Sequence, residues 1–118
     1  MTCSIEFIEN ISETALPIIK LTRSPNKETG TATFIFFYKE MQIKQYCFED
    51  SKLIKGMLLR WHTNFIFTKN IEIIFDNGHP FLIKSIILLK DSKEWFHFLN
   101  FMFYYSNDTG LFFEETLI

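Results

Sequence analysis

Residues 71–102 read IEIIFDNGHPFLIKSIILLKDSKEWFHFLNFM, and this stretch decides the fold. Two apolar runs flank Asn77-Gly78, the dipeptide that most favours a two-residue hairpin turn, because both central residues take positive φ. Asp91 then begins a helix, with Glu94 three residues later as its reciprocal capping partner. The stretch therefore predicts a β-hairpin followed by a helix that folds back over it.

The turn also predicts the register of the hairpin. Pairing across a two-residue loop places these residues opposite one another: Asp76 and His79, Phe75 and Pro80, Ile73 and Leu82, Ile71 and Lys84. Pro80 then occupies a non-hydrogen-bonded pair, where its missing N–H costs nothing. The proline and the turn dipeptide thus agree on one register.

The helix is expected over residues 92–106 and carries a core-facing stripe. Apolar residues recur along it at helical spacing, at Trp95, Phe98, Leu99, Met102 and Tyr105. Further apolar residues lie off the stripe, at Phe96, Phe103 and Tyr104. So wide an apolar surface predicts either a second contact for the helix or an exposed apolar face. Gly110 or Asn107 is expected to end the helix in the left-handed region.

Further strands are expected along the rest of the chain. Residues 31–38 (TATFIFFY) are apolar on both faces beyond Thr33, which predicts coverage on both sides or an exposed apolar face. The other strands are expected at residues 5–8, 18–23, 56–61, 65–75 and 81–89, with the last three forming a meander. The strand over 65–75 is expected to be one long strand with a bend near Lys69-Asn70. The remaining segments are expected to be an irregular connection at 39–55 with a helical turn near 49–52, a short strand at 111–113, and a frayed tail at 114–118.

This order of elements predicts a single domain over residues 1–118, of class α+β and mainly antiparallel β. The expected architecture is a twisted antiparallel sheet with one C-terminal helix packed on one face. Six short twisted strands can also curl into a partly open barrel, and the sequence leaves this alternative open.

The composition argues against several classes of partner. The chain has 118 residues, with 12 basic and 14 acidic residues and a net charge of −2. This balance gives no electrostatic reason to expect nucleic acid or an anionic membrane surface. No apolar run reaches the ~20 residues of a membrane helix and no signal peptide is visible, so we expect a soluble or peripheral protein. Cys3 and Cys47 are too few for a disulfide framework and are expected to be reduced thiols.

The histidines do not form a catalytic or metal-binding pattern. His62 and His79 lie in turns at opposite ends of one expected strand, so they are not expected to share a metal. His97 has no His or Cys four residues later on its helix. Phosphate-loop, dinucleotide-binding, zinc-protease and nucleophile-elbow motifs are all missing. We therefore expect no enzyme activity, no cofactor and no metal.

Two kinds of binding function remain. Aromatic residues alternate along two expected strands, as in a base-stacking platform for single-stranded RNA, at Phe34, Phe36, Phe65 and Phe67. These positions lack a basic surround, so a single-stranded RNA-binding domain is the alternative hypothesis. The other function is protein binding, because the edge of an antiparallel sheet can pair with an extended segment of a partner.

A set of short motifs resembles one known family. It begins with KLTRS at residues 20–24 and TGTATFIF at 29–36, and continues with IKGM at 54–57 and FDNGHP at 75–80. It ends with Glu94-Trp95, Phe98, Phe101-Met102, Tyr105 and Gly110-Leu111. In order and spacing, these motifs resemble the thirteen-kilodalton photosystem II assembly proteins, the Psb-twenty-eight family. The resemblance implies a non-catalytic assembly and repair factor that binds photosystem II assembly intermediates at the stromal or cytoplasmic face of the thylakoid.

The resemblance also implies partners and a location. The partners would be the forty-seven-kilodalton core antenna subunit, whose tail extends the sheet of the factor, and reaction-centre subunits near the secondary quinone site. No nucleic acid partner is implied, and attachment to the thylakoid would be peripheral, through protein contacts. The abundance of Phe, Ile, Lys and Asn, which have AT-rich codons, indicates an AT-rich genome such as that of an organelle. We therefore expect a plastid-encoded protein on the stromal side of the thylakoid.

We expect the strand over residues 33–37 or the strand over 56–61 to supply the binding edge. The candidate partner-binding residues on them are Thr33, Ile35, Phe37, Met57, Leu59 and Trp61. Phe96 and Phe103 are candidates on the outer helix face, because the family usually has charged residues there. The family also usually has an acidic, glycine-containing turn where this chain has RWHTN at 60–64, so the contact surface is expected to differ.

Overall fold

The computed structural model describes residues 3–26, 28–45, 54–111 and 113–117. Within these ranges the chain forms nine strands, one α-helix and two short 3-10 helices. The strands are β1 (Cys3–Ile8), β2 (Ile11–Ser12), β3 (Ile18–Arg23), β4 (Gly30–Phe37), β5 (Met57–Trp61), β6 (Asn64–Thr68), β7 (Ile71–Asp76), β8 (His79–Leu89) and β9 (Glu114–Leu117). The helices are η1 (Tyr38–Glu40), η2 (Gln42–Gln45) and α1 (Ser92–Thr109).

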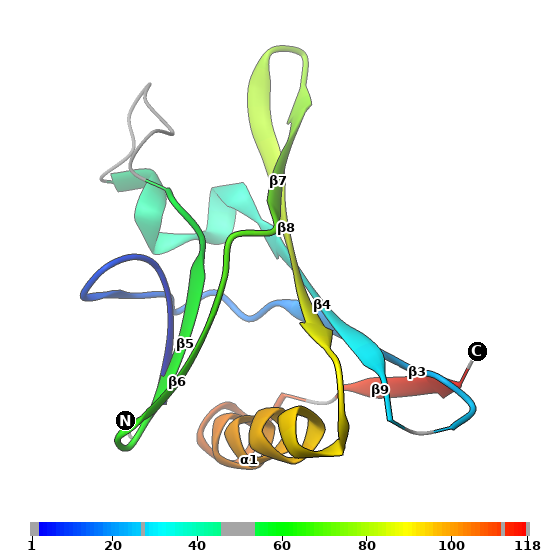
Figure 1. Ribbon diagram of the computed structural model, residues 1–118. Helices are drawn as coiled ribbons and strands as arrows, with labels where there is room; N and C mark the ends of the chain where they lie inside the picture. Colours follow the sequence, from blue (N-terminus) through cyan, green and yellow to red (C-terminus); the bar gives the residue numbers. More distant parts are fainter. Residues whose placement is uncertain (1–2, 27, 46–53, 112, 118) are drawn as a thin grey trace.

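The strands form two sheets that splay apart above α1 (Figure 1). The smaller sheet has the order β2-β1-β5-β6, and the larger has the order β7-β8-β4-β3-β9. Every pair is antiparallel except β3 and β9, which run parallel. The expected class, α+β with mainly antiparallel strands and one C-terminal helix, is confirmed. The two sheets do not close into a barrel.

Residues 65–75 form two strands, and the expectation of one long strand is wrong. β6 belongs to the smaller sheet and β7 to the larger, with the crossing at Lys69-Asn70. There the Ile71 N–H donates to the Lys69 carbonyl at 2.9 Å, which closes a tight bend. The expected meander is therefore divided, because β5–β6 and β7–β8 are hairpins of separate sheets.

The β7–β8 hairpin turns at the expected dipeptide. Asn77 and Gly78 take φ values of 52° and 82°, as a turn with two left-handed residues requires. The first two expected pairs are confirmed, but beyond them a bulge shifts the register by one residue, so that Ile74 faces Leu82 and Ile71 faces Ser85. The expected pairs further along were wrong because Phe81 is an extra residue on β8. β8 must also pair with β4 on its other side, from Leu82 opposite Phe37 onward, and the bulge lies just before that point.

The helix α1 starts where the sequence predicts and ends one turn later. The Asp91 side chain accepts a hydrogen bond from the Glu94 N–H at 2.8 Å. The Glu94 carboxylate in turn accepts from the Lys90 N–H at 2.7 Å, one residue before the expected partner. Gly110 ends the helix with φ 76°, and its N–H donates to the Ser106 carbonyl at 2.7 Å. The left-handed residue is thus Gly110, and the helix reaches Thr109.

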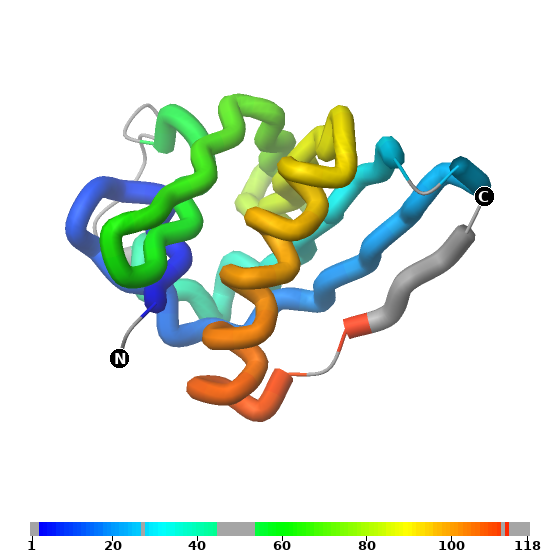
Figure 2. Tube along the Cα trace, turned by 60° about the horizontal axis from the view of Figure 1, so that its bottom comes forward, coloured from blue at the N-terminus to red at the C-terminus, as the bar shows by residue number. Residues whose placement is uncertain are grey.

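The core lies between the two sheets and α1, which runs across both of them (Figure 2). The helix stripe is confirmed: Trp95, Phe98, Met102 and Tyr105 are buried, and Leu99 is partly buried against the core. Phe101, which lies off that stripe, is also fully buried. It contacts Trp61 of the smaller sheet at 5.5 Å between ring centroids, whereas Phe98 contacts Phe34 of the larger sheet at 6.1 Å. The wide apolar surface of the helix therefore serves two sheets.

The expected structure of the tail and of the long connection needs correction. Residues 114–117 form β9 beside β3, so the tail is a strand and not frayed. Leu111 and Phe113 lie outside any strand, which contradicts a short strand at 111–113. The first part of the connection at 39–55 contains η1 and η2. The helical turn expected near 49–52 and Cys47 lie outside the described residues.

Candidate partner-binding surface

The two strands expected to supply a binding edge are interior strands. β4 lies between β3 and β8, and β5 lies between β1 and β6. The expected edge is therefore wrong for both strands. Each is covered by a segment distant in sequence, such as β1 beside β5, and a local pattern of alternation does not reveal such a neighbour.

The candidate contact residues differ widely in exposure. Met57, Leu59 and Trp61 are fully buried core residues and offer no surface to a partner. Thr33, Ile35 and Phe37 are half-buried on the outer face of β4, opposite the buried Ala32, Phe34 and Phe36. Phe96 and Phe103 are exposed on α1. Since Phe34 and Phe36 are core residues, the proposed aromatic platform for RNA is reduced to Phe65 and Phe67.

Two free backbone edges meet beside α1. β6 is the outer strand of the smaller sheet and pairs with β5 alone. β7 pairs with β8 only as far as Ser85, so residues 86–89 have a ladder partner on the β4 side alone. The edges touch where Thr68 Oγ1 donates to the Ile86 carbonyl at 2.7 Å. Beyond that contact, each edge lacks a described strand beside it.

The register shows which backbone groups these edges present. Antiparallel ladders direct alternate residues to opposite sides of a strand. The Ile86 N–H donates to Asn70, away from β4, so the N–H and C=O of Leu88 point the same way. On β6 the residues flanking the two-residue turn form a hydrogen-bonded pair, so Phe65 and Phe67 direct their N–H and C=O away from β5. Three residues thus offer backbone donors and acceptors to an added strand.

A groove of about 1160 Å³ lies between these edges and the first turns of α1. Four exposed apolar residues line it: Phe65 (64%), Phe67 (47%), Leu88 (58%) and Phe96 (68%). Exposed apolar side chains that gather in this way mark an interaction site more often than scattered ones do. Phe96 was expected from the sequence, whereas Phe65 and Phe67 were noted only as an RNA platform and Leu88 was missed.

The helix face that borders the groove is held by Trp61. The Trp61 Nε1 donates to Asn100 Oδ1 at 2.7 Å, and the indole lies 4.8 Å from the His97 ring centroid. Both Asn100 and His97 line the groove. Trp61 therefore supports the candidate surface from beneath instead of contacting a partner.

The three histidines each make a different local contact. His62 packs edge-on against Tyr104 at 4.6 Å, His97 packs on Trp61, and His79 pairs with Asp76 at the tip of the β7–β8 hairpin. In the described ranges, no three His, Cys, Asp or Glu side chains come close enough to hold a metal ion. That the protein has no metal, no cofactor and no enzyme activity stays a prediction.

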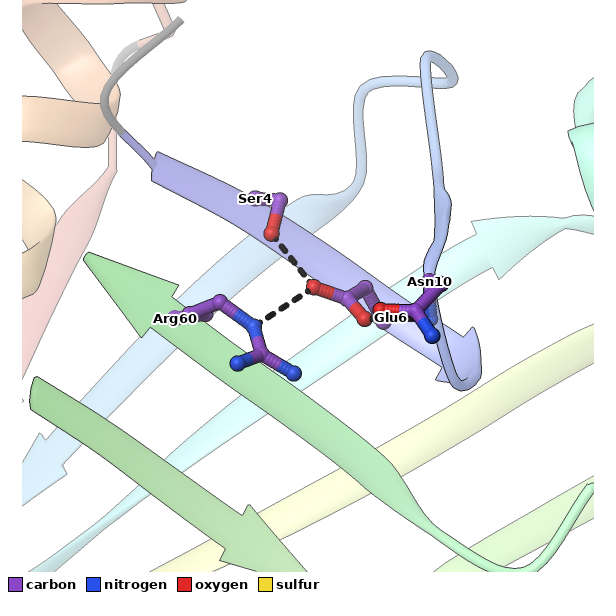
Figure 3. A network of polar contacts seen from close by, with 4 residues as sticks. All are labelled: Ser4, Glu6, Asn10 and Arg60. Atoms are coloured by element: carbon purple, nitrogen blue, oxygen red, sulfur yellow. Dashed lines mark hydrogen bonds and ion pairs between the residues drawn. The ribbon is translucent and has the colours of Figure 1, made fainter. Parts of the chain in front are cut away.

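A buried carboxylate lies on the outer face of the smaller sheet (Figure 3). Glu6 is only 5% exposed and accepts hydrogen bonds from Ser4 Oγ at 2.7 Å, the Asn10 N–H at 2.8 Å and Arg60 Nε at 3.0 Å. Burial opposes ionisation, but the three hydrogen bonds and the Arg60 charge outweigh it and lower the pKa of Glu6. The Arg60 side chain is 47% exposed and stands opposite Phe65 on the neighbouring strand.

A second buried carboxylate holds the connection after β4. Glu13 accepts the backbone N–H groups of Gln42 and Ile43, both at 2.8 Å, and so ties the segment after β2 to η2. Here burial raises the pKa of Glu13, and the backbone hydrogen bonds only partly offset it. The sequence singled out neither Glu6 nor Glu13, because their partners lie on distant segments.

The comparisons with known proteins cover nearly the whole chain. The model of the family described as Psb28 protein matches residues 5–113. The chain belongs to the Psb28 family. It is 36% identical over 112 residues to the photosystem II reaction center Psb28 protein of Pyropia yezoensis, covering 95% of this chain and 96% of the relative. The Psb28 proteins of Thalassiosira pseudonana and Nostoc punctiforme are 34% and 36% identical, over 98% and 91% of this chain and 99% and 93% of the relatives.

The Psb28 assignment confirms the resemblance seen in the sequence motifs. Members occur in red algae, diatoms and a cyanobacterium, under the same descriptive name. None of the described helices is both long enough and apolar enough to cross a membrane. The groove, its two free edges and the Arg60 network are thus features of a Psb28-family fold.

Proposed function

We propose that this Psb28-family chain is a non-catalytic photosystem II accessory protein that binds assembly intermediates reversibly. The names of its relatives, which are photosystem II reaction center Psb28 proteins, support the association with photosystem II. The protein would act at the stromal face of a plastid thylakoid, attached through protein contacts, in assembly or repair. Residues 1–118 would act as one domain in this role.

The observation that supports the binding mode is the pair of free edges in an apolar groove. The proposed occupant is an extended tail of the forty-seven-kilodalton core antenna subunit, which pairs with β6 through the N–H and C=O groups of Phe65 and Phe67. Leu88 of β8 lines the groove on the side opposite β6, and its N–H and C=O also point into the groove. The proposed pairing strand is thus β6, which has a free edge, and not β4 or β5, which the sequence led us to expect.

The strength of such pairing suits a factor that must leave again. A net backbone hydrogen bond contributes about 0.5–1.5 kcal/mol, and complete burial of a phenylalanine contributes about 1.5–3 kcal/mol. Ordering the tail and the loss of rigid-body freedom cost several kcal/mol. The favourable and unfavourable terms are of similar size, so a short strand in this groove is expected to bind weakly enough to be released again.

Other expected contacts keep a place in this proposal. Phe96 contributes to the groove, and Phe103 extends the exposed face of α1 beyond it. Thr33, Ile35 and Phe37 would contact reaction-centre subunits, because they lie on the outer sheet face that α1 does not cover. No observation favours the RNA-binding alternative, since half of its aromatic platform is buried.

Proline substitutions on β6 test the binding mode. Phe65→Pro removes an N–H that points into the groove and leaves the hydrogen bonds between β5 and β6 in place. Phe65→Leu is the matched control, because it keeps the N–H and an apolar side chain. We expect Phe65→Pro to weaken co-purification with photosystem II intermediates at least tenfold, while Phe65→Leu stays within about threefold of the wild type.

Leu88→Pro applies the same test to the opposite wall, where the N–H also points away from β4. Thermal melts establish that each variant is folded. If both proline variants are folded and bind photosystem II intermediates as well as the wild type does, the pairing of a tail in this groove is wrong.

A further inference from the structure

Arg60 presents a guanidinium that is held at one nitrogen only. Its Nε donates to Glu6 at 3.0 Å, and no acceptor among the described residues binds its two Nη groups. Glu6 is itself fixed, since Ser4 Oγ and the Asn10 N–H occupy its oxygens and the residue is almost completely buried. The Arg60 side chain is therefore held in place by Glu6 through Nε (Figure 3), and it is 47% exposed.

The surroundings of Arg60 are apolar. In the β1–β5–β6 ladder, Ser4, Arg60 and Phe65 form one row, and Glu6, Leu58 and Phe67 form the neighbouring row on the same face. Phe65 and Phe67 are both exposed there. An arginine flanked by exposed aromatic rings has the composition of an interface hot spot. Because the guanidinium is already oriented, the Arg60 side chain loses less conformational entropy when a partner binds it.

The charge of this face limits what the Nη groups can bind. Arg60 is the one basic residue in the two rows, and Glu6 lies within 3.0 Å of its Nε. A phosphate dianion next to a buried carboxylate would be repelled and would have no second cation. A carboxylate carries one negative charge and matches the planar Nη pair with two parallel hydrogen bonds.

We propose that the outer face of β1, β5 and β6 is a second interaction surface, which receives a carboxylate-bearing segment of a photosystem II core protein. An Asp, Glu or C-terminal carboxylate of that segment binds the two Nη groups of Arg60, and its apolar residues cover Phe65 and Phe67. This inference rests on the proposed function for its source of the partner. It concerns a different face of β6 from the backbone edge in the groove, so the two can be tested separately.

The test measures binding of the purified chain to purified photosystem II assembly intermediates by biolayer interferometry. We expect Arg60→Gln and Arg60→Lys to raise Kd about tenfold each, because lysine keeps the charge but cannot form the bidentate pair. Lys39→Gln, at an exposed lysine of η1, is the control and should leave Kd unchanged. Thermal melts show whether each variant is folded. If Arg60→Gln does not fold, Arg60→Lys still tests the proposal, because lysine keeps a cation beside the buried Glu6.

A second arm identifies the acceptor. Amidation of photosystem II carboxylates with a carbodiimide and an amine should weaken the wild type to the level of Arg60→Gln and leave Arg60→Gln itself unaffected. Vesicles of phosphatidylglycerol in phosphatidylcholine should bind neither protein. Binding of Arg60→Lys equal to the wild type, or Arg60-dependent binding to the vesicles, would overturn the proposed carboxylate.

The outcomes separate this inference from the proposed function. If Leu88→Pro abolishes binding but Arg60→Gln does not change it, the groove remains supported and the second surface is rejected. If Arg60→Gln weakens binding and Leu88→Pro does not, the second surface is supported and the groove is rejected. If the wild type does not bind the assembly intermediates at all, both are rejected.

Discussion

Two buried carboxylates show how single residues hold segments distant in sequence together. Glu6 and Glu13 are each almost completely buried, and each is saturated by hydrogen bonds from neighbouring segments. Their pKa values move in opposite directions, because the hydrogen bonds from Ser4, Asn10 and Arg60 outweigh the burial of Glu6, whereas backbone donors alone do not fully offset the burial of Glu13. Cys3 is a third buried group: burial and the hydrogen bond from its thiol to Asp108 raise the pKa of Cys3 to about 12, so it remains a thiol.

At the residue scale, the lowered pKa of Glu6 predicts a pH-dependent contribution to stability. Ionised Glu6 stabilises the fold above the ordinary carboxyl pKa of 4.5, and this contribution is lost as pH falls through the lower pKa of the folded state. Glu6→Gln should therefore reduce the free energy of unfolding by about 1–3 kcal/mol at pH 7. The difference from the wild type should shrink as the pH is lowered below 4.5.

Urea unfolding at neutral and acidic pH measures both effects. Glu28→Gln, at an exposed carboxylate, is the matched control and should change the free energy of unfolding by less than about 0.5 kcal/mol. A loss for Glu6→Gln that is the same at both pH values would contradict the predicted linkage.

At the element scale, α1 and the β7–β8 hairpin are specified by their own residues. The helix α1 has a side-chain cap at its start, a stripe of residues that faces the core, and a left-handed glycine at its end. The hairpin has the dipeptide that its turn requires. These signals act over a few residues, and so they were read correctly from the sequence. The bulge after Pro80 was not, because it depends on how β8 also fits against β4.

The helix cap predicts a measurable loss of stability. Asp91→Ala removes the acceptor of the Glu94 N–H and should lower the free energy of unfolding by about 1 kcal/mol. Ser92→Ala, one residue later and exposed, should change it by no more than about 0.5 kcal/mol. Urea denaturation of the two variants provides the comparison, and equal stabilities would show that Asp91 does not cap α1 in solution.

At the scale of the whole molecule, the two sheets are joined at the end of the groove by Thr68. Its Oγ1 donates to the Ile86 carbonyl at 2.7 Å and accepts from the Asn70 N–H at 3.1 Å. Thr68→Val keeps the shape of the side chain and removes both hydrogen bonds. We expect a loss of about 1–2 kcal/mol and faster hydrogen exchange at Ile86 and Asn70, where the sheets meet.

The exposed Thr63 of the β5–β6 turn offers the control, since Thr63→Val should leave exchange at these amides unchanged. Amides at the centre of the β4–β8 ladder should also exchange at wild-type rates. Unchanged exchange at Ile86 in Thr68→Val would mean that the junction does not depend on this side chain.

The sequence by itself determined the class of fold, the hairpin turn, the helix with its core stripe and the membership of the Psb28 family. Each depends on local periodicity, turn chemistry or the order of short motifs. Only the tertiary structure decided that β6 and β7 part at Lys69-Asn70, that β4 and β5 are interior strands, and that Phe65, Phe67 and Leu88 line a groove. These features depend on strands paired across long stretches of chain, and alternation along one strand shows which residues share a face but not which strand lies beside it.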